Sequence, residues 1–153
     1  MSRVALLDVN VLVALFDGDH VHHDIAHDWF ADNRASGWAT CPLTENGLVR
    51  VLTNPKYGGT VASVAEVFDR LRRFQKSGHH HFWPDAVSLA DSSLFKPSLL
   101  RGSRQLTDAY LLGLAHKNGG CLATFDRSIS AAAVAGATQD LLMVVGPGDT
   151  DSV

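Results

Sequence analysis

The sequence predicts an α/β fold in which a mainly parallel sheet carries helices on its faces. Short apolar runs alternate with segments of helical periodicity along the whole chain. The chain has 153 residues, of which 46% are hydrophobic, and this suffices for a domain with a buried core. Nothing reads as a linker, a repeat or a low-complexity block, so we expect a single domain over residues 1–146 and a flexible tail over 147–153.

The first half of the chain contains five predicted elements. They are strands at 4–7 and 38–41 and helices at 10–16, 22–35 and 44–54. Pro42 stops the second strand, and Thr44 opens the helix that follows it. That helix ends before Pro55, because the residue that precedes a proline disfavours the helical backbone.

The second half contains six predicted elements. They are helices at 63–78, 107–120 and 128–135 and strands at 80–83, 121–125 and 141–145. Ser63 and Glu66 form the capping box of the first of these helices, and Gly78 closes it. Thr107 caps the second helix, which ends at an Asn-Gly-Gly turn.

Four acidic residues fall at junctions between these strands and helices. Asp8 ends the first strand inside the apolar run LLDVNVLVALFD, and Asp126 ends the strand CLATF. Glu45 follows the second strand, and Asp108 lies in the first turn of the helix TDAYLLGLA. A lone carboxylate in an apolar interior, such as Asp8, costs several kcal/mol unless it is paired, hydrogen-bonded or bound to a metal.

Each acid taken alone has a plainer interpretation, since an acid at a helix start accepts hydrogen bonds from free backbone N–H groups. Together they indicate a site. In an open parallel sheet the carboxyl ends of the strands share one edge, and ligands bind where the strand order reverses. Carboxylates gathered there raise one another's pKa values unless a cation relieves them. Oxygen ligands without a neighbouring His or Cys suit Mg²⁺ or Mn²⁺, which favours metal-assisted hydrolysis of a phosphodiester.

The segments LLDVNVLVALF, LTDAYLLGLA and LATFDRSI, with Glu45 isolated between the first two, resemble those of PIN-domain ribonucleases. More narrowly, they resemble the VapC toxins of bacterial type II toxin–antitoxin pairs, from Arg3 to about Val145. The resemblance implies a three-layer α/β/α sandwich and a Mg²⁺- or Mn²⁺-dependent endoribonuclease. It assigns catalysis and metal binding to Asp8, Glu45, Asp108 and Asp126, the first and third being the strongest ligand candidates.

The resemblance also implies supporting residues and partners. Asn10 stands where the family often has Ser or Thr, and it can hydrogen-bond a ligating carboxylate or a water. Thr124 is expected to play a similar part. Such toxins cleave RNA and are held inactive by a cognate VapB-type antitoxin. They commonly form homodimers and toxin–antitoxin hetero-oligomers, and they reach DNA only through the antitoxin.

Charge and cysteine content limit the partners and the compartment. A net charge of −3 gives no general attraction to nucleic acid, so RNA must be held by a local patch or by metal ions. Cys41 and Cys121 form no CxxC pair, and we expect them to be buried thiols in a reducing cytoplasm. The N-terminus has no signal-peptide pattern, and no apolar run approaches the roughly 20 residues that a membrane helix needs.

Local positive charge is concentrated on the helix at 63–78, which carries Arg70, Arg72, Arg73 and Lys76. Such a run is usually a solvated face, but here it is also the best local patch for phosphates. Arg104 and Arg127 adjoin predicted site acids, where each could hold a phosphate or pair with a carboxylate. The candidates for RNA binding are therefore Arg73, Arg104 and Arg127.

The segment 20–27 is rich in histidine. His23 and His27 are one helical turn apart and could bind a transition metal. No Cys or HExxH motif accompanies them, so a polar loop followed by a solvated helix face is the plainer interpretation.

Two other functions are open alternatives. A phosphatase of the haloacid-dehalogenase type also ends its first strand in an Asp, which would make Asp8 a nucleophile. Its signature requires a second Asp two residues later, where this chain has Asn10. A binding module without catalysis would use the junction acids only as helix caps.

Overall fold

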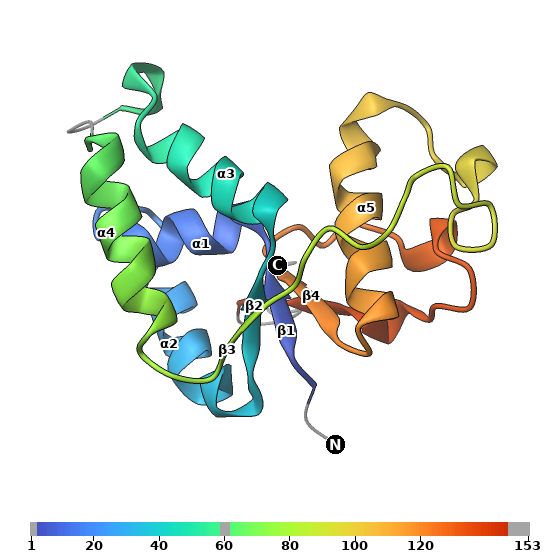
Figure 1. The fold of residues 1–153 in the computed structure, drawn as a ribbon, viewed down its shortest axis with the longest axis horizontal. Helices are drawn as coiled ribbons and strands as arrows, with labels where there is room; N and C mark the ends of the chain where they lie inside the picture. The colour runs from blue at the N-terminus through green and yellow to red at the C-terminus, as the bar shows by residue number, and fades with distance from the viewer. Residues whose placement is uncertain (1–2, 59–61, 147–153) are drawn as a thin grey trace, which may run out of the picture.

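The computed structural model describes residues 3–58 and 62–146, and a five-stranded sheet lies at the centre of this part of the chain (Figure 1). The strands are β1 (Ala5–Leu7), β2 (Trp38–Thr40), β3 (His80–Phe82), β4 (Cys121–Thr124) and β5 (Leu142–Val144). Their order is β3-β2-β1-β4-β5, and every pair of neighbours is parallel. The strand order therefore reverses between β1 and β4, which makes their carboxyl ends the expected binding edge.

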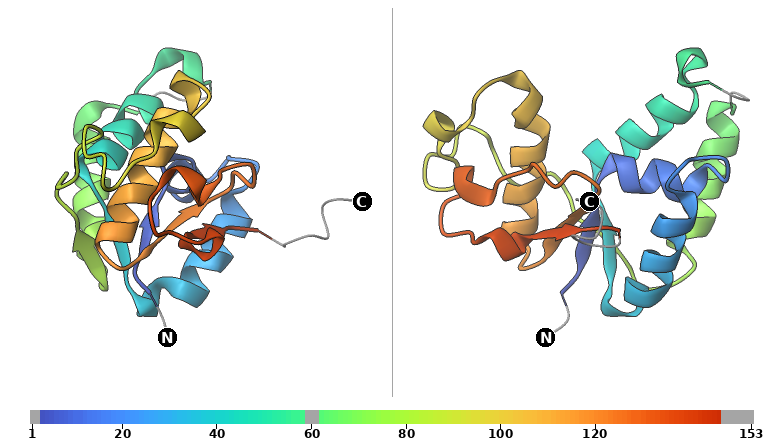
Figure 2. Two further views of the ribbon diagram at one scale, coloured as in Figure 1. Left: turned by 90° about the vertical axis from the view of Figure 1, so that its right-hand side faces the viewer. Right: turned by 180° about the vertical axis from the view of Figure 1, so that it is seen from behind.

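Within the same residues, five α-helices cover the two faces of the sheet. They are α1 (Val9–Phe16), α2 (His23–Asn33), α3 (Pro42–Leu52), α4 (Val64–Gln75) and α5 (Leu106–Lys117). The first four lie on one side of the sheet, and α5 lies on the other with the long segment that follows β3 (Figures 1 and 2).

Side chains along the central strands alternate between two cores, as the two-residue period of a strand requires. Ala5 and Leu7 pack in the core beneath α1 to α4, whereas Leu6 packs in the core beneath α5. Trp38 and Ala39 of β2 divide in the same way. Strands buried on both faces read as continuous apolar runs, as these do in the sequence. The predicted α/β/α sandwich with a parallel sheet is confirmed.

The predicted start of α3 is wrong. The helix begins at Pro42 rather than Thr44. The fixed φ of proline suits the first helical position, where the missing N–H would have had no partner within the helix. Thr44 lies inside the first turn, and its hydroxyl oxygen accepts a hydrogen bond from the Cys41 backbone N–H at 3.0 Å.

The predictions for α5 and for residues 128–135 also need correction. The 3₁₀ turn Ser103–Gln105 runs directly into α5, so the backbone is already helical before Thr107, which therefore does not cap the helix. The predicted helix at 128–135 contains only the 3₁₀ turn Ala131–Ala133. The Ser130 hydroxyl accepts a hydrogen bond from the Ala132 backbone N–H at 3.2 Å, and such a local side-chain bond favours a short turn over a continued α-helix.

Other expectations hold. The Ser63 hydroxyl accepts a hydrogen bond from the Glu66 backbone N–H at 3.1 Å and so caps α4. Cys41 and Cys121 are buried free thiols. The helices of the described residues are all too short or too polar to cross a membrane. The predicted tail at 147–153 lies outside the described residues.

Candidate active site

Asp8 lies between the end of β1 and the start of α1, at the carboxyl edge of the sheet where the strand order reverses. It is the helix cap, and its Oδ1 accepts a hydrogen bond from the Val9 backbone N–H at 2.7 Å. Its Oδ2 accepts one from the Thr124 hydroxyl at 2.8 Å. The pKa of Asp8 is raised overall. Burial is the main cause and the charge of the nearby Asp126 adds to it, whereas these two hydrogen bonds lower the pKa. The acid that interrupts the apolar sequence is therefore held at both oxygens.

Thr124, at the end of β4, connects Asp8 to its neighbours. A hydroxyl has one proton, and here it is donated to Asp8, so the oxygen is left to accept. It accepts from the side-chain amide of Asn10 at 3.2 Å and from the Asp126 backbone N–H at 3.1 Å. This arrangement also fixes the orientation of the Asn10 amide. Its Oδ1 is buried and has no hydrogen-bond partner among the described residues.

Asp108 and Asp126 lie close enough to Asp8 to interact with it electrostatically. Burial, followed by the charges of Asp8 and Asp126, raises the pKa of Asp108 to about 6. Asp126 is more exposed, and its Oδ1 accepts hydrogen bonds from the backbone N–H and the hydroxyl of Ser128, at 2.8 and 2.6 Å. Asp69 forms ion pairs with Arg72 and Arg73 within α4.

Glu45, in the first turn of α3, has a different set of partners. Its Oε2 accepts hydrogen bonds from the Thr40 hydroxyl and from the Gln75 side-chain amide, both at 2.7 Å. It also interacts electrostatically with His80. Burial lowers the pKa of His80 overall, and the Glu45 charge opposes this effect in part. The structure thus brings three of the predicted acids into one electrostatic cluster and holds Glu45 through residues of β2, β3 and α4.

Comparison with known proteins agrees with this geometry. Residues 5–135 match the model of the PIN domain family. The chain belongs to the PIN-domain family. It is 47% identical over 138 residues to Ribonuclease VapC44 of Mycobacterium tuberculosis (strain CDC 1551 / Oshkosh), an alignment that covers 90% of this chain and 96% of the relative.

Two more relatives come from Mycobacterium tuberculosis (strain ATCC 25618 / H37Rv). Ribonuclease VapC38 is 47% identical over 126 residues, which are 82% of this chain and 87% of the relative. Ribonuclease VapC39 is 39% identical over 137 residues, which are 90% of this chain and 99% of the relative. Within the PIN-domain family, the chain is therefore of the VapC type.

The donor groups of this PIN domain fit a hydrated divalent cation better than a closed metal cage. Among the described residues, no three His, Cys, Asp or Glu side chains are arranged to hold a metal by themselves. Mg²⁺ keeps several waters and needs only one or two carboxylates besides substrate phosphates. Asp8 and Asp108 supply mutually repelling carboxylates, and the unpartnered Asn10 Oδ1 is an acceptor for a bound water.

A small pocket of about 70 Å³ borders the acid cluster of this PIN domain. Asp108 and Ser128 line it together with apolar groups of Leu99, Leu100 and Ile129. A larger groove, of about 520 Å³, runs between α3 and α4 and is lined at one end by Glu45 and Gln75.

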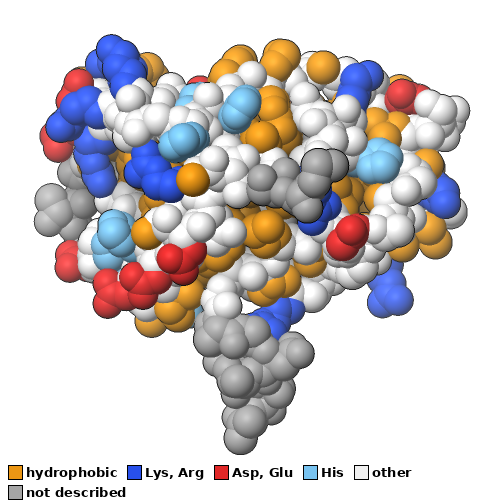
Figure 3. All heavy atoms as spheres, turned by 90° about the horizontal axis from the view of Figure 1, so that it is seen from below, with side chains coloured by type: hydrophobic (Ala, Val, Ile, Leu, Met, Phe, Trp, Pro, Cys, Tyr) orange, Lys and Arg blue, Asp and Glu red, His pale blue; other side chains and the backbone are white. Residues whose placement is uncertain are grey.

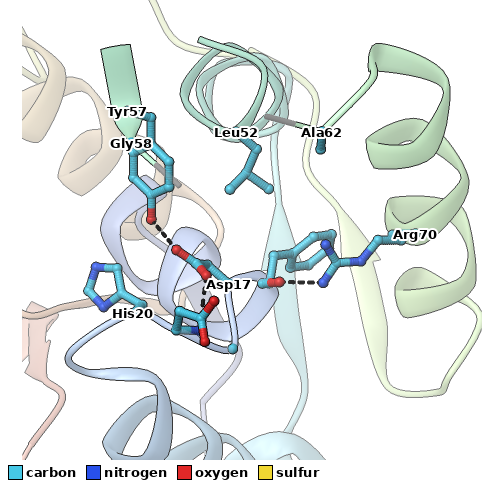
Figure 4. Close-up of a pocket in the computed structure, with 10 residues that line it drawn as sticks. Asp17, His20, Leu52, Tyr57, Gly58, Ala62 and Arg70 are labelled. Carbon is cyan, nitrogen blue, oxygen red and sulfur yellow. Dashed lines mark hydrogen bonds between the residues drawn. The ribbon is translucent and has the colours of Figure 1, made fainter. Parts of the chain in front are cut away.

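Another pocket, of about 460 Å³, is lined by Phe16 and Asp17 at the end of α1 (Figure 4), whereas Asp8 caps the start of that helix. There the Tyr57 hydroxyl donates to Asp17 Oδ2 at 2.7 Å, and the Arg70 guanidinium donates to the Phe16 carbonyl oxygen. The separation by the whole length of α1 shows that this pocket is not part of the acid cluster.

The arginines proposed for RNA binding do not form one continuous surface. Arg73 on α4 forms an ion pair with Asp69 at 2.9 Å. Arg104 is exposed in the turn before α5, and Arg127 is exposed beside Asp126. On the face shown in Figure 3, Lys and Arg side chains likewise occur in separate groups, with a group of acids near one edge.

The histidines of segment 20–27 have packing partners. His23 Nδ1 lies 2.7 Å from the Ala14 carbonyl oxygen, and its ring is 5.9 Å from that of His27. The His22 ring lies 5.0 Å from that of Phe125. These contacts fit the plainer interpretation of a polar segment packed on the domain.

Sequence reasoning missed Thr40, Gln75 and His80. A signal was present for Thr40, a polar residue at the end of a buried strand, in the position that Thr124 occupies on β4. Gln75 and His80 carry no such signal, because they approach Glu45 only through tertiary packing.

Proposed function

We propose that this PIN domain is a Mg²⁺- or Mn²⁺-dependent endoribonuclease toxin that a VapB-type antitoxin neutralises. Its relatives are named ribonucleases of the VapC type and match nearly the whole chain. The observation that carries the proposal is the cluster of Asp8, Asp108 and Asp126, in which burial and like charges raise carboxylate pKa values. A divalent cation offsets charge of this kind.

In this proposal Asp8 and Asp108 bind the cation, and Glu45 and Asp126 complete the site directly or through water. When bound, Mg²⁺ or Mn²⁺ supplies the positive charge that lowers the pKa of a water and offsets the charge of the phosphate. The Thr124 hydroxyl and the Val9 backbone N–H hold the two oxygens of Asp8 in place. Asn10 holds Thr124 through its amide.

The partners follow from the same proposal. RNA is the substrate, and Arg73, Arg104 and Arg127 contact its phosphates. The cognate antitoxin covers the site, and the toxin forms a homodimer and a hetero-oligomer with the antitoxin, which alone contacts DNA. The protein acts in the cytoplasm.

The alternatives have less support. A phosphatase of the haloacid-dehalogenase type needs a second Asp two residues after its nucleophile, and that position holds Asn10, whose side-chain amide donates to Thr124 and has no carboxyl group to exchange a proton. A pure binding module accounts for Asp8 as a helix cap. It gives no reason for a second, partly buried carboxylate, Asp108, placed against it.

Incubation of the purified protein with RNA, with and without Mg²⁺ or Mn²⁺, tests the proposal. We expect cleavage that depends on the metal and that both Asp8→Ala and Asp108→Asn abolish. Asp32→Asn, which changes an exposed acid of α2, is the matched control and should cleave like the wild type. Equal cleavage by all variants would reveal a contaminating nuclease, and cleavage of small phosphate esters but not RNA would favour a phosphatase.

A further inference from the structure

The hydrogen bonds behind Glu45 form a closed network from three different elements. Thr40 ends β2, Gln75 ends α4 and His80 begins β3. The Thr40 hydroxyl and the Gln75 amide both donate to Glu45 Oε2 at 2.7 Å. Thr40 Oγ1 also lies 2.8 Å from His80 Nε2 and 3.3 Å from Gln75 Nε2.

Counting protons fixes the direction of these hydrogen bonds. The single proton of the Thr40 hydroxyl is donated to the Glu45 carboxylate, which has none to give in return when ionised. His80 Nε2 must therefore donate to Thr40 Oγ1, which selects the His80 tautomer that carries its proton on Nε2. Thr40 is fully buried, with 0% of its surface exposed, so water does not compete for these bonds.

The two oxygens of Glu45 differ as a result. Oε2 accepts two hydrogen bonds, whereas no described residue donates to Oε1. The network thus holds the carboxylate by one oxygen and leaves the other for a ligand. Thr124 makes contacts comparable to those of Thr40. It is also a buried threonine at a strand end, and its hydroxyl donates to the Asp8 carboxylate and accepts from the Asn10 side-chain amide.

We propose that Thr40, supported by Gln75 and His80, is a positioning residue that fixes Glu45 for RNA cleavage by binding its Oε2 and leaving its Oε1 to the site. This inference rests on the proposed function, because it gives Glu45 the role assigned there. Thr40 touches neither substrate nor metal and acts through Glu45. Groups that orient a metal-site carboxylate commonly change metal affinity or activity by about 10- to 100-fold when they are removed.

The test compares Thr40→Val, which keeps the shape but lacks the hydroxyl, with Thr40→Ser, which keeps the hydroxyl. For Thr40→Val we expect kcat for RNA cleavage to fall by about 10- to 100-fold with KM little changed, and Mn²⁺ affinity, measured by titration, to weaken about tenfold or more. Thr40→Ser should restore most of both. Thr53→Val is the matched control, because the hydroxyl of Thr53, the residue after α3, donates to the Val49 carbonyl oxygen of that helix and not to Glu45.

A second variant keeps the test decisive if Thr40→Val does not fold. Gln75→Leu removes the other donor to Oε2 from a half-buried position at the end of α4, and it should lower kcat and Mn²⁺ affinity in the same direction. Circular dichroism and thermal unfolding identify the variants that are folded.

The outcomes separate the two proposals. If Glu45→Ala loses cleavage but folded Thr40→Val and Gln75→Leu keep wild-type kcat and Mn²⁺ affinity, the positioning role is refuted and the proposed function stands. The positioning role is also refuted if Thr40→Ser is as impaired as Thr40→Val, because the hydroxyl is then not what matters. If Glu45→Ala cleaves like the wild type, the assignment of Glu45 fails, and the positioning role fails with it.

Discussion

Asp108 is the residue at which the electrostatics of the acid cluster can be measured. Its pKa is raised from 3.8 to about 6 by burial and by Asp8 and Asp126. A raised carboxyl pKa means that the folded protein holds the proton more tightly than the unfolded chain does. This group therefore favours the folded state fully below pH 4, and its contribution is lost as the pH rises through about 6.

From this we predict that Asp108→Asn, in EDTA, is more stable than the wild type at pH 8 but not at pH 4. The expected gain in unfolding free energy at pH 8 is about 1 kcal/mol, since solvent screens a half-buried group and reduces the full effect. Urea unfolding at both pH values measures it, with Asp32→Asn as the control. Added Mn²⁺ should reverse the order, because it stabilises only a protein that binds it. A gain of equal size at both pH values would contradict the electrostatic cause.

At the residue scale, the sequence indicated the acids but not the residues that hold Glu45. Asp8 could be singled out because a carboxylate in an apolar run needs a physical reason. Asn10 and Thr124 lie two positions from Asp8 and Asp126 in the sequence, and the resemblance to PIN-domain ribonucleases pointed to them. Gln75 lies 30 positions from Glu45, and only the packing of α4 against α3 brings the two together.

At the scale of elements, α5 packs unusually close to the segment that follows β3. A Cβ placed on Gly113, in the middle of α5, would overlap the Phe95 ring, which is buried. Alanine is normally preferred to glycine inside a helix by about 1 kcal/mol. Overpacking a well-filled core costs about 1–3 kcal/mol, so the overlap should outweigh the gain in helix propensity.

We therefore predict that Gly113→Ala lowers the free energy of unfolding, by up to about 2 kcal/mol. Replacing the ring as well, in the double variant Gly113→Ala with Phe95→Leu, should recover part of that loss, because the overlapping ring atoms are gone. Gly18→Ala is the control, since nothing lies within 4 Å of its added Cβ. Stabilisation by Gly113→Ala would show that Phe95 moves aside at little cost.

Hydrophobic periodicity predicted the type and order of the strands and α-helices, because both faces of the sheet are buried and each helix needs an apolar side. Helix starts were less predictable. Proline is typical both after the end of a strand and at the first position of a helix. Pro42 therefore did not by itself indicate whether α3 begins there or later. Thr107 has the preferred chemistry of a cap, but the 3₁₀ turn before it already sets the helical backbone.

At the scale of the whole molecule, a net charge of −3 means that RNA binding must come from a few local contacts. The logarithm of the affinity for single-stranded RNA falls with the logarithm of salt concentration with a slope of about −0.7 per phosphate contacted. A protein held by few contacts therefore shows a shallow slope, and each arginine that binds a phosphate contributes a measurable part of it.

We predict that Arg104→Ala, in the cleavage-deficient Asp108→Asn protein, makes this slope shallower by about 0.7 and weakens binding equally for all RNA sequences. Arg73→Ala should have a smaller effect, because Asp69 already pairs with that guanidinium at 2.9 Å. Asp69→Asn should release Arg73 and steepen the slope. Fluorescence anisotropy across a salt series measures all three variants. The prediction fails if Arg73→Ala and Arg104→Ala change the salt slope equally and Asp69→Asn does not change it. The ion pair on α4 then does not limit RNA binding, and α4 contacts the substrate as strongly as the turn before α5.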